Sequence, residues 1–241
     1  MLTVSDLLCR ETMPTWNDIS FRLYKDFSVQ HLLNRRFEYH LVNGSVINVE
    51  FKEWAMKHLW SIQHIDASID KNCLFVMIDS GLDISTFMAD NRKRKKLLHY
   101  KDRIRMFACI YYIMKSGNLF YVKNGIIEGT RVKINYIRSK IISAKGVNVG
   151  MRLEEGVYVP LTVLIDTAIN PYKTVEGLCP QKVFKLLIKE NGKVIEEIYY
   201  DNYWGEDGKK VIVAKNRVPN CFRADTYSEK LKQAKLRNRL G

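Results

Sequence analysis

Two kinds of hydrophobic pattern follow one another in the first 51 residues. Between Thr15 and Arg35 the apolar residues recur at roughly the helical period, which predicts one helix with Thr15 as its N-cap. From Phe37 to Phe51 apolar and polar residues alternate on both sides of Asn43-Gly44. Alternation around an Asn-Gly pair is the strongest short-range signal for a β-hairpin. The pattern therefore predicts a helix followed by a two-stranded hairpin.

Further along, helical segments predominate before Gly117 and strands after it. The helical period predicts helices at Lys52–Trp60, Ser85–Lys96, Leu97–Lys115 and, near the C-terminus, Asp225–Arg239. Alternation predicts strands at Asn118–Lys123, Arg131–Arg138, Ile141–Asn148, Val157–Asp166, Lys182–Glu190 and Lys193–Tyr200, with Asn191-Gly192 turning the last pair into a hairpin. This order predicts an α+β fold in which an antiparallel sheet packs on helices that lie mostly in the N-terminal half.

The 241 residues divide into three parts: an N-terminal helical segment at 1–36, a core at 37–204 and a basic C-terminal extension at 205–241. The N-terminus lacks the basic and apolar regions of a secretory signal, and no window approaches 18 uncharged apolar residues. The five cysteines include no CxxC pair, so we interpret them as thiols in a reducing compartment. We expect a cytoplasmic protein, in a bacterial host cell, with no membrane partner.

The charge is concentrated in two segments. The formal net charge is +13, and Arg92–Arg105 and Lys230–Arg239 together carry +12 of it. A solvated helical face would explain one such run, but two runs that hold nearly all the net charge favour a polyanionic partner. We therefore predict nucleic-acid binding, with RNA favoured, by eleven bases: Arg92, Lys93, Arg94, Lys95, Lys96, Lys101, Arg103, Lys232, Lys235, Arg237 and Arg239.

Motifs for common chemistries are missing from the sequence. It contains no GxxxxGK[ST] or GxGxxG loop, no HExxH, no GxSxG and no cysteine knuckle. We accordingly expect neither a cofactor nor a metal. What remains is the segment His58–His64, where two histidines stand beside Trp54 and Trp60. Imidazole suits proton transfer near neutral pH, but a histidine beside a tryptophan is more often packed, and His64, flanked by Ile62 and Ile65, is predicted to be packed rather than catalytic.

The run at 37–65, FEYHLVNGSVINVEFKEWAMKHLWSIQHI, resembles the phage-associated branch of the barnase–EndoU–colicin–RelE-like nucleases. In that branch an alternating strand, a glycine turn, a second strand ending in Phe and a His-Leu-Leu-Gly-Ile-type segment recur in order. Here His58-Leu59 stands at the His-Leu core, and Trp60-Ser61 departs from the Leu-Gly of the pattern. Later matches, which extend the resemblance over roughly 37–200, are Lys101–Lys115, Tyr158–Thr162 with Thr162 in place of Ser, Tyr172, and Gln181-Lys182-Val183.

The resemblance implies a small metal-independent ribonuclease. Such an enzyme needs a base for the RNA 2′-OH, an acid for the leaving 5′-oxygen and cations for the phosphorane charge. It implies His58 as base or acid, Arg105 or Lys182 as a phosphate clamp, and Thr162 and Gln181 as phosphate or ribose contacts. Each has a structural alternative: Arg105 as a cap of a helix turn, Thr162 as an ordinary strand residue, Lys182 as a projection from a strand edge.

Three functions follow from these observations. The first is a toxin-like ribonuclease, encoded by a phage or mobile element, that cleaves structured RNA such as tRNA and has a protein antitoxin as partner. The second is a non-catalytic binder of RNA, DNA or a ribonucleoprotein, such as a phage-encoded inhibitor of host defence. The third is a peripheral membrane protein that uses the C-terminal basic helix, which Leu231, Ala234 and Leu240 disfavour because they give that helix little apolar face.

Overall fold

The structure is a computed structural model that describes residues 1–123, 133–166 and 178–200. The predicted helix Asp225–Arg239 lies outside the described residues, and with it lie Lys232, Lys235, Arg237 and Arg239. Tyr172 and the first part of the predicted strand Arg131–Arg138 also lie outside them.

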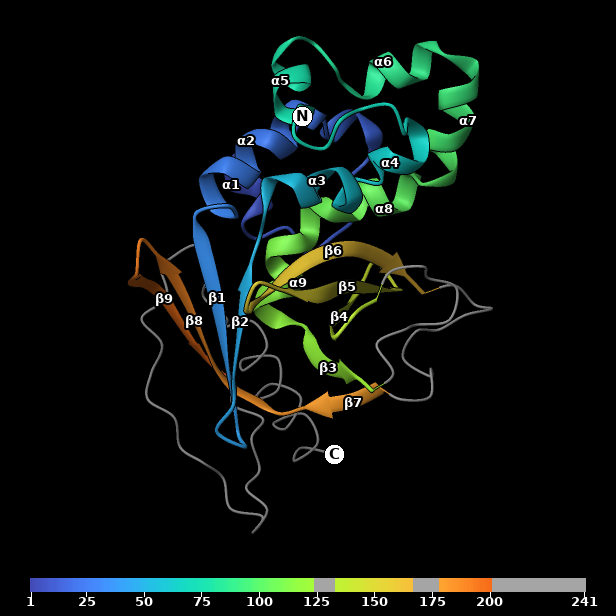
Figure 1. The fold of residues 1–241 in the computed structure, drawn as a ribbon. Coiled ribbons are helices and arrows are strands. Elements are labelled where there is room, and N and C mark those ends of the chain that lie inside the picture. Colours follow the sequence, from blue (N-terminus) through green and yellow to red (C-terminus); the bar gives the residue numbers. More distant parts are fainter. Residues whose placement is uncertain (124–132, 167–177, 201–241) are drawn as a thin grey trace, which may run out of the picture.

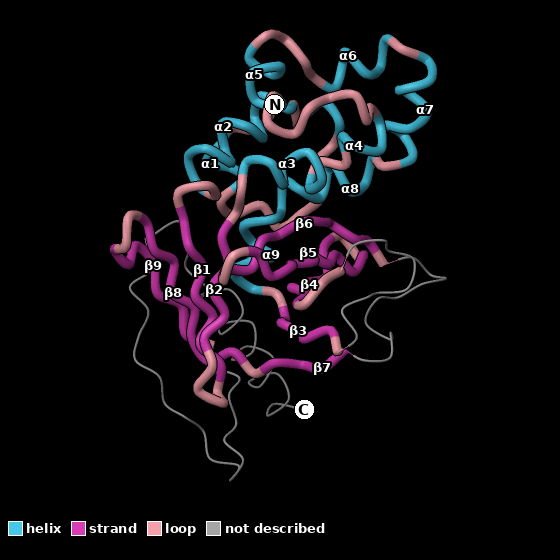
Figure 2. The backbone as a smooth tube through the Cα atoms, in the orientation of Figure 1, coloured by secondary structure: helices cyan, strands magenta, loops and turns pink. Residues whose placement is uncertain are grey.

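Short helices make up most of the chain up to Ser116 (Figure 1). They are α1 (Val4–Leu7), α2 (Phe21–His31), α3 (Glu53–Leu59), α4 (Ile62–Ile65), α5 (Leu74–Asp79), α6 (Ile84–Ala89), α7 (Asn91–His99), α8 (Lys101–Met106) and α9 (Ile110–Ser116), with 3₁₀ turns η1 (Trp16–Asp18) and η2 (Phe107–Cys109). The helices α1 to α8 gather above the sheet, whereas α9 lies against it (Figure 2).

The strands form one nine-stranded sheet within the described residues. They are β1 (Arg35–Leu41), β2 (Val46–Glu50), β3 (Asn118–Val122), β4 (Tyr136–Ile142), β5 (Lys145–Glu154), β6 (Val157–Ile165), β7 (Leu178–Gln181), β8 (Val183–Glu190) and β9 (Lys193–Tyr199). Their order is β7-β3-β4-β5-β6-β2-β1-β8-β9, and every pair is antiparallel except the parallel pair β2–β6. The α+β class is confirmed, and the sheet is mixed but largely antiparallel.

The sheet curls around α9. Strands β7 and β8 stand far apart in the strand order, yet Lys182 alone separates them in sequence. Helix α9 packs against β4 and β5 on one arm of the sheet. On the other arm, the Tyr39 hydroxyl of β1 donates to the Met114 carbonyl of α9, with 2.9 Å between the oxygens. One helix therefore contacts both arms, and the core lies between them.

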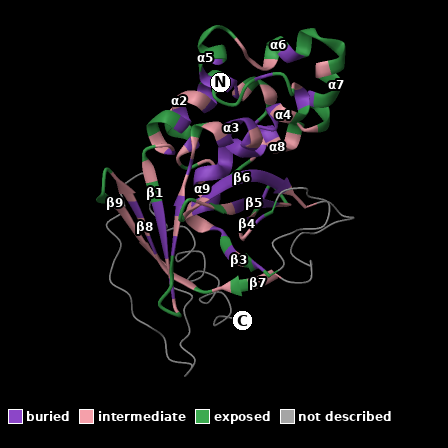
Figure 3. Ribbon diagram, viewed as in Figure 1, coloured by how far each residue is buried: buried purple, intermediate pink, exposed green. Residues whose placement is uncertain are grey.

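The core also joins the N-terminal helices to the sheet. Phe21 and Phe27 of α2 are fully buried, and they lie in one hydrophobic cluster with Trp60, Phe107 and Ile188. Figure 3 shows this buried interior at α9 and the inner strands, while much of α5, α6 and α7 is exposed. The boundary predicted between residues 36 and 37 falls inside β1, because that strand begins at Arg35.

Two of the predicted long helices are broken by caps. The predicted helix Thr15–Arg35 is confirmed only over Phe21–His31: Thr15 is the N-cap of a 3₁₀ turn, and Ser20 caps the separate helix α2 by accepting from the Leu23 amide. The predicted helix Ser85–Lys96 is divided into α6 and α7 at Asp90, whose carboxylate accepts from the Arg92 and Lys93 amides. An Asp at this position satisfies the amides that a helix start leaves free, so a new helix axis begins there.

The predicted helix Leu97–Lys115 is also divided. It forms the end of α7, then α8, η2 and α9, with Tyr100 as both the C-cap of α7 and the N-cap of α8. The apolar period continues through these breaks because each piece faces the same core. Tyr100 therefore lies at a corner of the chain, between α7 and α8.

Both hairpins predicted from Asn-Gly are confirmed, and a third turn was missed. Strands β1 and β2 pair around Asn43-Gly44, and β8 and β9 pair around Asn191-Gly192. The predicted strand Ile141–Asn148 is wrong, because a two-residue turn at Ser143-Ala144 separates β4 from β5. Both turn residues have positive φ, 47° and 63°, which a two-residue type I′ turn requires. Neither is Gly or Asn, so the sequence carried no sign of the turn.

Replacing Ala144 with glycine is expected to raise the free energy of unfolding by about 0.5–1 kcal/mol. Ala144 has a left-handed backbone conformation, which costs a residue with a Cβ about 1–2 kcal/mol. Glycine removes this cost, but it loses more conformational entropy on folding than alanine, so the net gain in stability is smaller. Urea denaturation measures the change. The matched control is Ala89→Gly in α6, which should lower stability by up to about 1 kcal/mol. Loss of stability in Ala144→Gly would contradict the strain.

Candidate functional site

Helix α3 places Trp54 and His58 on one face, one helical turn apart, and leaves both half-buried. Between them in sequence, Ala55 is fully buried and packs against Val159 and Leu161 of β6. This contact fixes α3 across β6. It holds His58 at the joint between the helices and the sheet, where the side chain is partly covered but still reached by solvent.

His64 lies on α4, directly after the turn that begins at Ser61. The expectation that it is packed is wrong: Ile62 and Ile65 are buried, while His64 is exposed on the other side of this short helix. Its ring stacks on that of Tyr100, with the centroids 4.5 Å apart and the planes 15° from parallel. Stacking of this kind holds an exposed imidazole in one orientation.

The positive side chains around His58 disfavour a further charge on its ring. Burial is the main cause that lowers the pKa of His58 below 6.5, followed by the charges of Lys57, Lys71 and Arg152. Lys57 is itself nearly buried and donates to the backbone carbonyls of Ala67 and Ile69. At neutral pH the His58 imidazole is therefore mostly neutral, which is the form that accepts a proton.

The pKa of His64 is also lowered. The main cause is the partial loss of hydration where the ring packs on its neighbours, and the charges of Arg103, His58 and His99 lower the pKa further. The ring of Tyr100 contacts His64, His99 and Arg103. We call these three side chains, together with His58, the imidazole cluster; His58 joins it through its electrostatic effect on His64. Burial is the first cause that lowers the pKa of both His58 and His64, and the charges that add to it differ between the two side chains.

Arg103 ties the cluster to the sheet. Its Nη2 donates to the Thr162 Oγ1 of β6, at a distance of 2.9 Å, and its guanidinium lies 5.6 Å from the centre of the Tyr100 ring. Arg103 is half-buried on α8 and Thr162 is nearly buried. The fold therefore joins two residues that the sequence singled out separately, Thr162 and Arg103, although Arg103 was predicted only as an RNA-binding base. His58 is related to them only through His64.

Helix α7 leads directly into the cluster, because it ends at His99 and Tyr100. Its side chains Arg92, Arg94, Lys95 and Lys96 are exposed, as is Lys101 after it, and none of them forms an ion pair with a described residue. Lys93 differs, since it pairs with Asp66 at 2.7 Å. The hydrogen bond from Lys93 is the largest cause that lowers the pKa of Asp66 to about 2. Asp66 thus anchors one side of α7 while the other bases face solvent.

Three predicted catalytic residues do not belong to this cluster. Arg105 donates to the Pro14 carbonyl at 2.6 Å and pairs with Asp102, so it holds the N-terminal segment against α8. Gln181 lies on β7, which β3, β4 and β5 separate from β6 in the sheet. Its amide donates to backbone carbonyls of its own strand. Lys182 follows it at the junction with β8, and its carbonyl accepts from the Val42 amide.

The sequence reading missed three members of the site: His64 as an accessible group, His99 and Tyr100. A signal existed for His64, because the apolar Ile62 and Ile65 already occupy the core side of so short a helix. His99 and Tyr100 carried none, since their position depends on the corner between α7 and α8. The described residues contain no group of three or more His, Cys, Asp or Glu side chains that could hold a metal ion.

None of the helices in the described ranges has the length and apolar character needed to cross a membrane. Comparisons with known protein families, with curated proteins and with solved structures found no match to this chain.

Proposed function

We propose that the chain is a metal-independent endoribonuclease of the barnase–EndoU–colicin–RelE-like kind, which cleaves structured RNA such as tRNA. The observation that supports this proposal is the imidazole cluster: His64, His99 and Arg103 surround the Tyr100 ring, and His58 lies within electrostatic range of His64. Cleavage of RNA by its own 2′-OH needs a proton acceptor, a proton donor and positive charge, and the cluster contains all three.

The reaction can be written with these side chains alone. A neutral imidazole takes the proton of the 2′-OH, and the 2′-oxygen attacks the adjacent phosphorus. The bond from phosphorus to the 5′-oxygen breaks, and this oxygen takes a proton from the second, protonated imidazole. The products are a 2′,3′-cyclic phosphate and a 5′-hydroxyl. His58 and His64 are the candidates for the two roles.

Arg103 is the candidate for stabilising the phosphorane. Its guanidinium is planar, always charged and presents several donors, which suits a phosphate. The hydrogen bond to Thr162 and the packing on Tyr100 hold this group before substrate binds, and donors fixed in advance are the ones that favour a transition state most. The exposed bases of α7 then lie next to the cluster, where they can hold the phosphates of neighbouring nucleotides.

The test is cleavage of total tRNA and of a single-stranded RNA by the full chain in excess chelator. Fragments ending in 2′,3′-cyclic phosphate are expected, with a bell-shaped dependence of kcat/KM on pH that peaks below pH 6.5. The base works only above its pKa and the acid only below its pKa, and both values lie below 6.5 in the free protein. RNA left intact at every pH, or cleavage that chelator abolishes, contradicts the proposal.

A second candidate is a non-catalytic binder of RNA or of a host ribonucleoprotein. The exposed bases Arg92, Arg94, Lys95 and Lys96 favour it, because they face solvent on one helix whether or not the imidazoles react. Intact RNA together with a salt-sensitive gel shift would support this function. In that case His58→Ala would leave the shift unchanged.

A further inference from the structure

Helix α8 is held at its start by two bases that share one carboxylate. Asp102, in the first turn of this six-residue helix, is half-buried. Its Oδ2 accepts from the Nζ of Lys145, the first residue of β5, and its Oδ1 lies 3.4 Å from the Arg105 Nη1. A carboxylate whose two oxygens are held by different bases has little freedom to rotate. We call Asp102, Arg105 and Lys145 the α8 anchor.

The β4–β5 turn supplies this lysine, and the N-terminal segment closes the contacts into a ring. The Arg105 Nε donates to the Pro14 carbonyl at 2.6 Å, and the Met13 amide donates to the Ser143 Oγ at 3.1 Å. Ser143 opens the turn that ends directly before Lys145. The left-handed backbone of this turn, which costs energy, therefore sets two contacts that reach outside its own hairpin.

Arg103, next to Asp102 in sequence, ties the same helix to the neighbouring strand. Its Nη2 donates to the Thr162 Oγ1 of β6 at 2.9 Å, while Lys145 lies on β5, which pairs with β6. Two attachments on two strands fix both the position of α8 and its rotation about its own axis, whereas one attachment would leave the rotation free. The buried Ile104 also packs α8 into the core, but apolar contacts have no direction and tolerate a small rotation.

The proposed reaction depends on the orientation of Arg103. A guanidinium stabilises a phosphorane best when its donors are held within about 0.5 Å of the productive geometry, and a displacement of about 1 Å can cost about 100-fold in rate. We propose that Asp102 and Lys145 are positioning residues for Arg103; this inference rests on the proposed ribonuclease function. Both act through the direction in which α8 presents Arg103, without contact to the RNA.

Kinetics of tRNA cleavage by the full chain test this assignment with Asp102→Asn and Lys145→Gln. Each variant is expected to lower kcat about 10- to 100-fold and to leave KM within a few-fold, because the exposed bases of α7 are unchanged. Lys145→Arg, which keeps the charge, should retain most of kcat. The two neutral variants alter different elements, so a folding defect in one leaves the other as the test.

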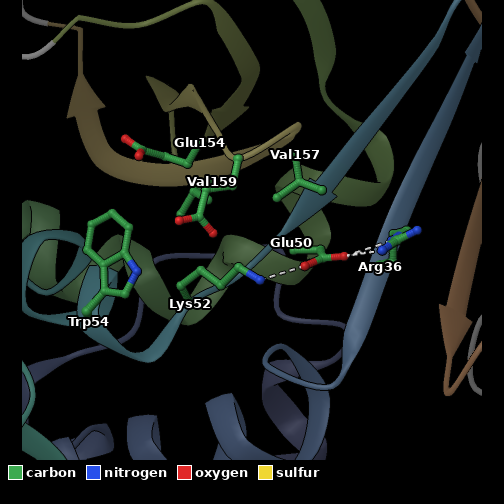
Figure 4. A pocket seen from close by; sticks show the side chains of 8 residues that line it. Arg36, Glu50, Lys52, Trp54, Glu154, Val157 and Val159 are labelled. Carbon is green, nitrogen blue, oxygen red and sulfur yellow. Dashed lines mark hydrogen bonds and ion pairs between the residues drawn. The ribbon is translucent and has the colours of Figure 1, made fainter.

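The control must remove a carboxylate that an Arg and a Lys share elsewhere in the fold. Figure 4 shows one such carboxylate, Glu50, which accepts from Arg36 and Lys52. Asp79 is another, and it joins α5 to an Arg and a Lys of α2. Because Glu50 stands shortly before α3 and its reacting histidine, Asp79→Asn is the matched control and should leave kcat unchanged.

A double-mutant cycle shows whether the carboxylate acts through the guanidinium. In the Arg103→Ala background, Asp102→Asn should lower kcat by less than about twofold further, because no guanidinium is left to orient. Losses that multiply, or an unchanged kcat in both Asp102→Asn and Lys145→Gln, overturn the inference while the ribonuclease stands. A loss of the same size in Asp79→Asn would assign the effect to the fold in general and overturns it as well.

NMR order parameters of the Arg103 side-chain N–H groups give a readout that needs no cleavage. In the free full chain they are expected to fall in Asp102→Asn and Lys145→Gln and to stay unchanged in Asp79→Asn. This result in a chain that cleaves no RNA would support the positioning of Arg103 and contradict the ribonuclease. Order parameters that change in neither anchor variant overturn the inference.

Discussion

Replacing His58 or His64 with alanine is expected to lower kcat for RNA cleavage by about 10²- to 10⁴-fold in either case, the range typical of a lost general acid or base. Burial and nearby positive charges lower the pKa of each imidazole, so each can take one half of the proton transfer. Because the two groups would act in a single step, the double variant should lose little more than the worse single variant.

Two measurements separate this loss from damage to the fold or to binding. The Kd for a substrate with a 2′-deoxy group at the cleavage position should stay within a few-fold of the original value, since the imidazoles are mostly neutral at pH 7. The matched control is His31→Ala. His31 is half-buried on α2 and also has a pKa lowered by burial, but it lies beside Arg35 and Glu190. Unchanged kcat in both His58→Ala and His64→Ala would exclude the imidazole cluster as the active site.

The fold was predictable wherever the local sequence pattern favoured the same conformation as the tertiary contacts. Asn-Gly pairs mark the β1–β2 and β8–β9 hairpins because those residues accept positive φ without strain. Ser143-Ala144 makes the same kind of turn without such residues. There the pairing of β4 with β5, and the hydrogen bond from the Met13 amide to Ser143, hold a conformation that the two residues disfavour locally. Tertiary contacts of that kind leave no trace in the local pattern.

In the site too, some residues were predictable from local sequence and others depend on tertiary contacts. His58 was found because imidazole chemistry is recognisable in sequence, and Thr162 because a family pattern pointed to it. Arg103 donates to Thr162 and its charge acts on His64, yet the sequence places it inside a run of bases where nothing distinguishes it from Lys101. Gln181 and Lys182 failed to join them, since motif order along a chain does not determine which strands are neighbours. The parallel pair β2–β6, which brings α3 onto β6, was equally invisible.

The second large effect is expected from the exposed bases of α7, and it concerns the salt dependence of RNA affinity. Replacing Arg94, Lys95 and Lys96 with glutamine is expected to raise KM and leave kcat nearly unchanged, because these side chains face solvent and none belongs to the imidazole cluster. For single-stranded RNA, three lost phosphate contacts should reduce the slope of log affinity against log salt by about 2. Between 50 and 200 mM salt the original chain should then lose about 20-fold more affinity than the variant.

A control with the same loss of charge decides whether position or total charge matters. Lys123, Lys133 and Lys193 are exposed on the sheet side of the molecule, and replacing them with glutamine removes three charges far from α7 in the sequence. Filter binding across a salt series should give this control the slope of the original chain. If both triple variants changed the slope equally, the +13 charge would act as a diffuse field. A change confined to the α7 variant would mean that RNA lies along this helix, with its backbone directed toward Tyr100 and the imidazoles.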